Sequence, residues 1–188
     1  MTGIGDIIGP LRVGSPAHGG ACVARQEGMA VFIYGTLPGE LVRAEVVETR
    51  SRLWFARAVE ILEPSPYRVP HIWPLAARTG VGGADLGHVS LPMQLKWKAD
   101  VITEQLRRIA HIEHKVKVEA APLDTGRGGL GYRTRVDFVA DDAGHLGMFI
   151  PWSNQIVPID SMPLVDSKIA AVEPWRHVFE PGSRISLI

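Results

Sequence analysis

The sequence has little cysteine, no excess of charge of either sign and no long apolar run, and each shortage excludes a class of protein. A single cysteine, Cys22, excludes an internal disulfide and a metal site built from several thiolates. Lys and Arg together number 20, as do Asp and Glu, so the formal net charge is zero, whereas a free-standing nucleic-acid-binding protein is usually basic. There is no run of about 18 apolar residues and no signal-peptide pattern, which predicts a cytoplasmic protein that does not enter a membrane.

Short apolar runs separated by glycine and proline fill the N-terminal third of the chain. Runs such as residues 41–47 and 54–62 are rich in β-branched and aromatic side chains, with turn-forming residues before and after them. Strands at this spacing predict a β-barrel over residues 4–62. Residues 63–70 contain three prolines and are expected to form an extended linker, and residues 71–89 lack periodicity and are expected to form an irregular loop.

The remainder of the chain predicts one long helix and several antiparallel strands. The helix begins near Ser90, which can cap it, and Pro92 is tolerable in its first turn. Its apolar residues recur at helical spacing, at Leu95, Ala99, Ile102, Leu106 and Ile109. The expected strands are residues 115–120, 133–140 and 147–157, with a glycine-rich loop at 124–131 and a turn at 141–144. The predicted fold class is therefore α+β, mainly β with one long helix.

Three spaced blocks stand near the N-terminus, at residues 14–25, 28–33 and 37–42. Together they resemble a TRAM domain, a small OB-like β-barrel that precedes the catalytic part of many RNA-modifying enzymes. A fourth block, residues 131–138, is similar to the Tyr-Arg-x-Arg strand of the RNA uracil-C5 methyltransferases. The resemblance extends over about residues 5–166. It implies a TRAM-like barrel at 1–62, a linker and cysteine-type loop at 63–91, and part of the family's central α+β domain at 92–188.

The loop at residues 73–84, followed by 88–92, resembles the cysteine loop with which this family holds an iron–sulfur cluster. Apolar residues stand where the family has its cysteines, namely Trp73, Val81, Ala84 and Met162. None of these side chains supplies the thiolate that such a cluster needs. The expectation is a chain without an iron–sulfur cluster, in which the four side chains close a small hydrophobic cluster instead.

The first candidates for RNA contact lie in the TRAM-like blocks. His18, Gly19 and Gly20 could present a polar side chain and exposed backbone amides to a phosphate, and Arg25 lies in the same block. The alternative is a tight turn that requires glycine.

The second candidates are Arg133 and Arg135, which flank Thr134 in an expected strand. Alternation along a strand would place both side chains on one face, where paired guanidinium groups suit phosphate or base-edge contacts. The alternatives are solvation, or ion pairs with Asp137 and Glu119.

The remaining motifs give little support to a metal site or a nucleotide-binding loop. His111 and His114 are three residues apart, a spacing that can chelate, but no third ligand lies at a suitable interval. Residues 126–131 are rich in glycine, yet they lead into an expected strand rather than from a strand into a helix. Tryptophans could stack on bases, with burial as the alternative, at Trp73, Trp97, Trp152 and Trp175.

The family's reaction needs a nucleophilic cysteine, a carboxylate base and a domain that holds S-adenosylmethionine. Cys22 lies in the expected barrel, so the chain by itself is not expected to catalyse methyl transfer, and S-adenosylmethionine is expected only on a separate catalytic domain.

Two hypotheses remain. In one, the chain is the RNA-recognition portion of an enzyme acting on rRNA or tRNA, recorded as a fragment, split-gene product or truncated gene. In the other, it is a stand-alone RNA-binding or protein-interaction module. A remnant without an RNA role is a third option. The helix at 92–110 is expected to support self-association or to bind a catalytic partner.

Overall fold

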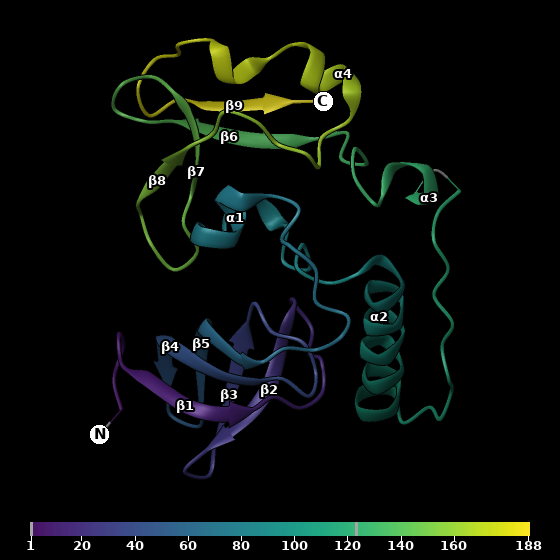
Figure 1. Ribbon diagram of the computed structural model, residues 1–188. Helices are drawn as coiled ribbons and strands as arrows, with labels where there is room; N and C mark the ends of the chain where they lie inside the picture. Colours follow the sequence, from purple (N-terminus) through teal and green to yellow (C-terminus); the bar gives the residue numbers. More distant parts are fainter. Residues whose placement is uncertain (1, 123) are drawn as a thin grey trace. The chain divides into compact units, whose positions relative to one another are not determined.

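The computed structural model describes residues 2–122 and 124–188, which form two compact units (Figure 1). The first unit combines residues 1–70 with 85–119, and the second combines residues 71–84 with 120–188. The chain therefore passes from one unit to the other three times, after residues 70, 84 and 119. As a result, the long helix groups with the N-terminal strands, and the cysteine-type loop groups with the C-terminal strands.

The first unit contains a five-stranded sheet in the order β1-β4-β5-β3-β2. Its strands are β1 (Ile7–Arg12), β2 (Ala21–Gln26), β3 (Met29–Tyr34), β4 (Leu41–Arg50) and β5 (Leu53–Glu63). Neighbouring strands are antiparallel except β3 and β5, which are parallel.

The predicted closed barrel is not formed, because no ladder joins β1 to β2 within the described part of the chain. The residues that follow β1 occupy the outer edge of β2 instead. The amide of Gly14 donates to the carbonyl of Val23 at 2.7 Å, and the amide of Val23 donates to the carbonyl of Ser15 at 3.0 Å. These bonds satisfy the edge of β2, which leaves β1 as the opposite edge strand.

Local sequence explains the turn between β2 and β3 and the alternating burial of residues along β4. Glu27 and Gly28 both have positive φ, 50° and 81°, which is the conformation of the two-residue turn that joins β2 to β3. Along β4, alternate residues are fully buried at Val42, Ala44 and Val46. This period of two is the one that a strand with one covered face requires.

A buried ion pair fastens the proline-rich segment 63–70 to the sheet. The guanidinium of Arg68 donates to both carboxylate oxygens of Glu40 at 2.7 Å, and the amides of Ser65 and Leu37 donate to the same group. The side chain of Glu40 is 0% exposed. Burial alone would raise the pKa of Glu40, but the hydrogen bonds from Arg68, Ser65 and Leu37 outweigh it and hold the pKa below its usual value. The expected extended linker is thus a fixed part of the first unit.

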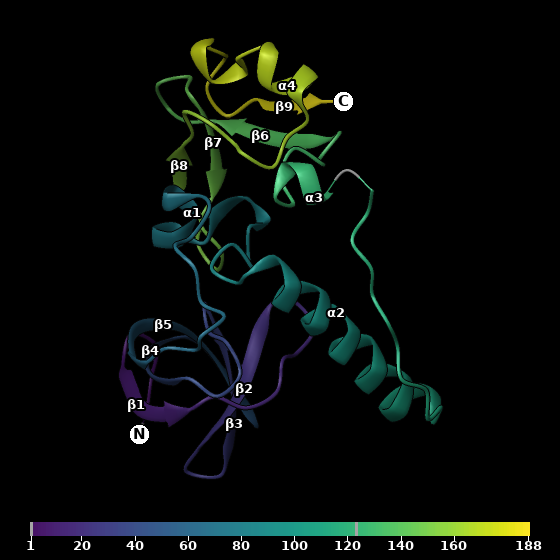
Figure 2. The same ribbon diagram turned by 45° about the vertical axis from the view of Figure 1, so that its right-hand side comes forward.

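Helix α2 (Leu91–Gln105) lies beside this sheet and ends in a single π turn over residues 106–110 (Figures 1 and 2). The side chain of Ser90 makes no capping bond, contrary to the prediction. The helix is anchored by Trp97, which is 2% exposed within the core of the strands, with Val101 packed beside it. One large indole buries more apolar area than several small side chains, so it sets the orientation of the helix.

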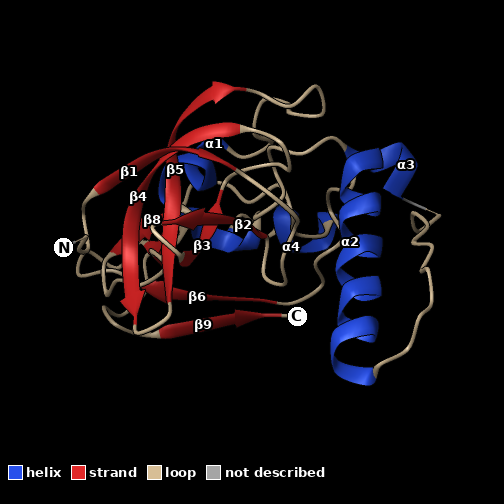
Figure 3. Cartoon of the chain, turned by 90° about the horizontal axis from the view of Figure 1, so that it is seen from below, coloured by secondary structure: helices blue, strands red, loops and turns tan. Residues whose placement is uncertain are grey.

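The predicted apolar stripe of α2 is not the face that covers the sheet. Ile102 is 44% exposed and Ile109 is 74% exposed. Leu95 and Ala99 instead line a shallow groove with residues 115–118, which run back along the helix as an extended segment (Figure 3). The predicted strand at 115–120 is wrong, because no strand among residues 2–122 and 124–188 pairs with it; the amide of Val116 donates to the hydroxyl of Thr103 instead. The structure gives self-association through residues 92–110 no support.

The second unit is built on a four-stranded antiparallel sheet in the order β8-β7-β6-β9. Its strands are β6 (Val136–Ala140), β7 (Leu146–Phe149), β8 (Ile156–Pro158) and β9 (Arg184–Leu187). The expected strand at 147–157 is therefore two strands joined by a turn. The predicted turn at 141–144 is present, closed by the bond from the Gly144 amide to the Asp141 carbonyl at 2.9 Å.

Short helices surround this sheet. They are α1 (Pro74–Thr79), α3 (Asp124–Arg127) and α4 (Ser167–Ala171), with 3₁₀ turns at Val81–Gly83 and Pro174–Arg176. The two segments expected to be irregular, 71–89 and 124–131, thus each contain a short helix. Within residues 2–122 and 124–188, no helix is long and apolar enough to cross a membrane.

Candidate nucleic-acid interface

The turn at residues 17–21 exposes two of the predicted contact residues. His18 and Gly19 are exposed, and the amide of Ala17 donates to the carbonyl of Ala21 at 2.7 Å. Gly20 has a φ of 85°, and a Cβ added to it would lie 2.8 Å from the Cβ of Asp85. The requirement for glycine at this position therefore has a packing explanation, independent of any ligand. Arg25 is also exposed, within β2.

Arg133 and Arg135 do not act as a matched pair. Both precede β6, so the prediction that they lie in a strand is wrong. Arg133 is held on both sides of its backbone: its amide donates to the carbonyl of Leu164, and its carbonyl accepts from the amide of Asp166. Its Nη1 donates to the carbonyl of Gly82 at 3.0 Å. Arg133 thus fixes the loop that resembles the cysteine loop, while the side chain of Arg135 is exposed to solvent.

The structure brings all four cysteine-loop positions into one buried hydrophobic cluster. Trp73, Val81, Ala84 and Met162 are exposed by 3%, 1%, 8% and 3%, respectively. The indole of Trp73 lies against Gly82, where an added Cβ would come within 2.1 Å of Cζ3. No oxygen, nitrogen or thiolate ligand is offered by these four side chains, so they do not fit an iron–sulfur cluster. Across the described residues, no group of three or more His, Cys, Asp or Glu side chains is placed to hold a metal ion.

Cys22 is unsuited to nucleophilic chemistry. Its side chain is fully buried, and burial raises the pKa of the thiol to about 12. The Sγ atom lies 3.7 Å from the carbonyl oxygen of Thr36, to which it donates. At neutral pH the thiol is therefore protonated and inaccessible.

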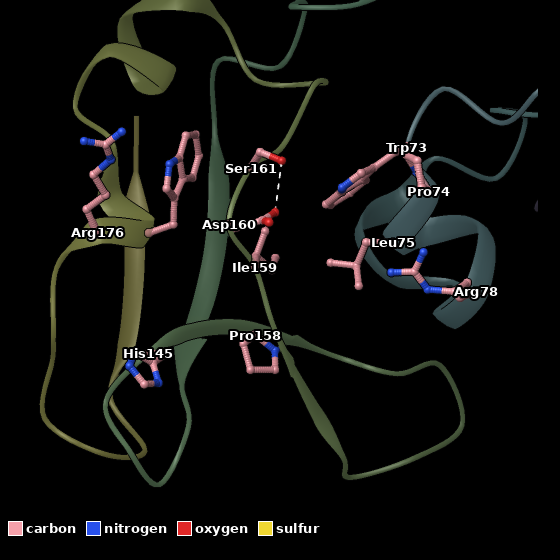
Figure 4. A pocket seen from close by; sticks show the side chains of 11 residues that line it. Trp73, Pro74, Leu75, Arg78, His145, Pro158, Ile159, Asp160, Ser161 and Arg176 are labelled. Atoms are coloured by element: carbon pink, nitrogen blue, oxygen red, sulfur yellow. Dashed lines mark hydrogen bonds between the residues drawn. The ribbon is translucent and has the colours of Figure 1, made fainter.

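A pocket of about 700 Å³ opens on the second unit, and we call it the tryptophan pocket (Figure 4). Its apolar lining comes from Trp73, Pro74, Leu75, Pro158, Ile159 and Trp175. Its polar lining comes from Arg78, His145, Asp160, Ser161 and Arg176. Arg78 lies on the α1 side and Arg176 on the opposite side, with Asp160 between them (Figure 4). The lining thus contributes two guanidinium groups and one carboxylate, and Arg176 also pairs with Glu173 at 3.1 Å.

A second hollow, of about 510 Å³, is lined by residues of β6, β7 and β9 and by Gly82 and Gly83. Arg133 and Arg184 contribute to its lining, together with Phe149, which is half-exposed. Asp137 also lines it, and its carboxylate accepts from the hydroxyl of Ser186 across the β6–β9 ladder.

Sequence reasoning overlooked Arg78, Arg176 and Arg184 as site residues. For Arg78 a signal existed: it lies three residues after Leu75, so a helix would put both on one side. Arg176, in the 3₁₀ turn Pro174–Arg176, and Arg184, in β9, are distant in sequence from most of the residues that line the same hollows, and only tertiary packing brings them near.

No protein-family model matches the chain. A Bifidobacterium longum protein named an uncharacterized RNA methyltransferase is 45% identical over 188 residues, which covers 94% of this chain and 43% of that protein. A Streptomyces coelicolor protein of the same description is 38% identical over 161 residues, covering 80% of this chain and 35% of that protein. The chain is related to proteins named RNA methyltransferases. It spans less than half the length of these two relatives.

Among solved structures, one match is the Pyrococcus abyssi tRNA (uracil-54, C5)-methyltransferase in complex with S-adenosyl-L-homocysteine. It has a TM-score of 0.49 and 22% sequence identity, and the match covers 86% of this chain and 35% of that chain.

Proposed function

We propose that this chain is the RNA-recognition portion of an RNA uracil-C5 methyltransferase acting on rRNA or tRNA, and that it does not transfer methyl groups by itself. The observation that carries the proposal is the 45% identity to a protein named an RNA methyltransferase, over 94% of this chain but only 43% of that relative. The TRAM-like blocks support the assignment, since they coincide with β2, β3 and the turn that leads into β4.

The chemistry of the described residues favours recognition over catalysis. Cys22 is buried and protonated, so it offers no nucleophile for addition to a base. Residues 126–131, which have the glycines of a nucleotide loop, belong partly to α3, and the described residues 111–122 before them contain no strand. A dinucleotide-type loop needs a strand before it and a helix after it. S-adenosylmethionine would therefore be held outside these residues.

The charge balance sets the expected strength of RNA binding. With 20 basic and 20 acidic residues, the chain can neutralise few phosphates, because many basic side chains are paired with carboxylates. Affinity should therefore be weak, and it should fall with salt in proportion to the few contacts made, by about 0.9 in log K per log unit of salt for each phosphate contact on a duplex.

Fluorescence anisotropy with a labelled tRNA and a labelled rRNA fragment tests the proposal. We expect saturable binding at about 50 mM salt that weakens markedly by about 200 mM. A matched assay with S-adenosylmethionine should yield no methylated RNA. Absence of binding at low salt would reject the recognition role, and methyl transfer by this chain alone would reject its non-catalytic character.

A further inference from the structure

We infer that the tryptophan pocket holds one unstacked nucleotide of a single-stranded RNA segment, with its base against the apolar lining and its phosphates at Arg78 and Arg176. The inference rests on the proposed RNA-recognition function and assigns it a site. It further assigns a base class: a base that carries an exocyclic amino group, rather than uracil.

The size and rigidity of the pocket suit a single base. A volume of about 700 Å³ lies within the range of small-molecule sites and leaves room for a nucleotide with its sugar. Trp73 and Ile159 belong to the core of the second unit and are only 3% and 4% exposed. Because the core fixes these side chains, the pocket does not have to be ordered when a ligand enters.

An aromatic platform is available at Trp175. This side chain is half-buried against the same core and lines the pocket. A half-buried indole can stack on a base while its other edge stays packed, and stacking of this kind tolerates different bases.

The two arginines lie where the flanking phosphates of a bound nucleotide would pass. Both are exposed and come from opposite sides of the opening (Figure 4). Arg176 pairs with Glu173 at 3.1 Å, but both side chains are solvated, and such surface pairs contribute little. The guanidinium of Arg176 can therefore exchange this carboxylate for a phosphate, which it can bind through two parallel hydrogen bonds.

Asp160 supplies discrimination between bases. Its Oδ1 accepts a hydrogen bond from the Ser161 hydroxyl at 3.1 Å, which leaves further acceptor positions on the carboxylate (Figure 4). A carboxylate accepts from an exocyclic amino group, as in cytosine. Uracil has no such group, and its two carbonyl oxygens flank the single N–H and repel a carboxylate. The nucleotide in this pocket is therefore a neighbour of any uridine to be methylated, and not that uridine.

Binding of labelled single-stranded oligocytidine and oligouridine by the whole chain tests this site. The wild type should bind oligocytidine more tightly than oligouridine. Arg78→Ala and Arg176→Ala should each weaken oligocytidine binding and lower the salt slope by about one, whereas Lys168→Ala, which removes an exposed charge outside the pocket, should not. Trp175→Ala should weaken binding about tenfold.

Asp160→Asn provides a variant at an exposed position, where loss of the fold is not expected. Because the amide both donates and accepts, the preference for oligocytidine should fall to about parity, with oligouridine binding retained. If the wild type binds the structured RNAs but the arginine variants match Lys168→Ala, or the preference survives in Asp160→Asn, the pocket assignment is wrong and the proposed function stands. If the wild type binds no RNA at all, both fail.

Discussion

The two units solve the same problem, fastening a loop to a sheet, by opposite means. In the first unit, the proline-rich segment is held by a buried carboxylate, Glu40, which receives hydrogen bonds from Arg68 and from two backbone amides. In the second unit, the loop at 73–84 is held mainly by apolar contact, with Trp73 against Gly82 and Met162 in the same cluster, and one hydrogen bond from Arg133 to the Gly82 carbonyl adds to it. The polar anchor is directional and depends on charge, whereas the apolar anchor depends on shape. Each therefore fails under a different kind of substitution.

The largest expected effect follows from removing the charge of the polar anchor. Glu40→Gln leaves the guanidinium of Arg68, whose side chain is 22% exposed, without its carboxylate. Breaking a buried pair on one side costs about 3 kcal/mol or more, and urea denaturation should show a loss of that size. The matched control is Glu60→Gln, which removes a solvated partner of Arg43 in the same sheet and should cost less than about 1 kcal/mol. Equal losses in the two variants would contradict the anchoring role.

The apolar anchor should break when its shape is changed. Gly82→Ala introduces a Cβ that would collide with the Trp73 ring, at a residue with a φ of 80°. Overpacking and left-handed strain together should destabilise the chain by about 3 kcal/mol in the same denaturation assay. Gly128→Ala separates the two causes. Gly128 also has a positive φ, 61°, but a Cβ added to it would have no neighbouring atom within 4 Å. Its cost should be about 1 kcal/mol. A loss no greater in Gly82→Ala than in this control would show that ring contact is unimportant.

Acid should distinguish the two anchors. The pKa of Glu40 is lowered in the folded chain, so its contribution to stability is present above the unfolded pKa and is lost as the pH falls through the folded pKa. Trp73, Val81, Ala84 and Met162 carry no titrating group, so the contacts of the apolar anchor have no such dependence. Thermal midpoints of wild type and Glu40→Gln, measured from neutral to acidic pH, should therefore converge below the usual range of a glutamate. The difference between wild type and Gly82→Ala should persist.

The smallest effects concern the two arginines. Arg133→Ala removes the bond to the Gly82 carbonyl and should lower stability by about 1 kcal/mol. Arg135→Ala should leave stability unchanged and, if Arg135 contacts a phosphate, reduce the salt slope of RNA binding by about one. Parallel denaturation and anisotropy measurements on both variants test this division of roles. A stability loss in Arg135→Ala, or no stability loss in Arg133→Ala, would contradict these roles.

Local patterns were sufficient to predict much of the first unit. Short apolar runs bounded by turn-forming residues predicted β4 and β5, and the start near Ser90 located α2 to within a residue. Closure of the sheet was not predictable, because it depends on whether β1 or residues 14–16 pair with the edge of β2, and both choices satisfy the same sequence. The buried face of α2 was missed for a similar reason. The period of the smaller apolar residues favoured the stripe through Ile102, but the single indole of Trp97 buries more surface.

The candidate site was harder to predict than the fold. Trp73, Val81, Ala84 and Met162 were singled out because they stand in a spaced motif that resembles the family's cysteine loop. Arg176 and Trp175 meet Arg78 only through tertiary packing, and no spacing in the sequence relates them. Arg133 looked like a surface residue, since its bond to Gly82 joins positions 51 residues apart.

The threefold passage of the chain between units has a consequence for synthesis on the ribosome. The strands of the first unit are translated well before Trp97, so part of their apolar face stays uncovered until α2 has been synthesised. The loop at 71–84 remains without its packing partners for longer, because β6 and β9 follow residue 135. Synthesis of the second unit begins at residue 71, before the first unit is completed at residue 119. This differs from the usual order, in which nascent chains fold one domain after another. For the same reason, no single cut in the gene yields either unit with its core intact.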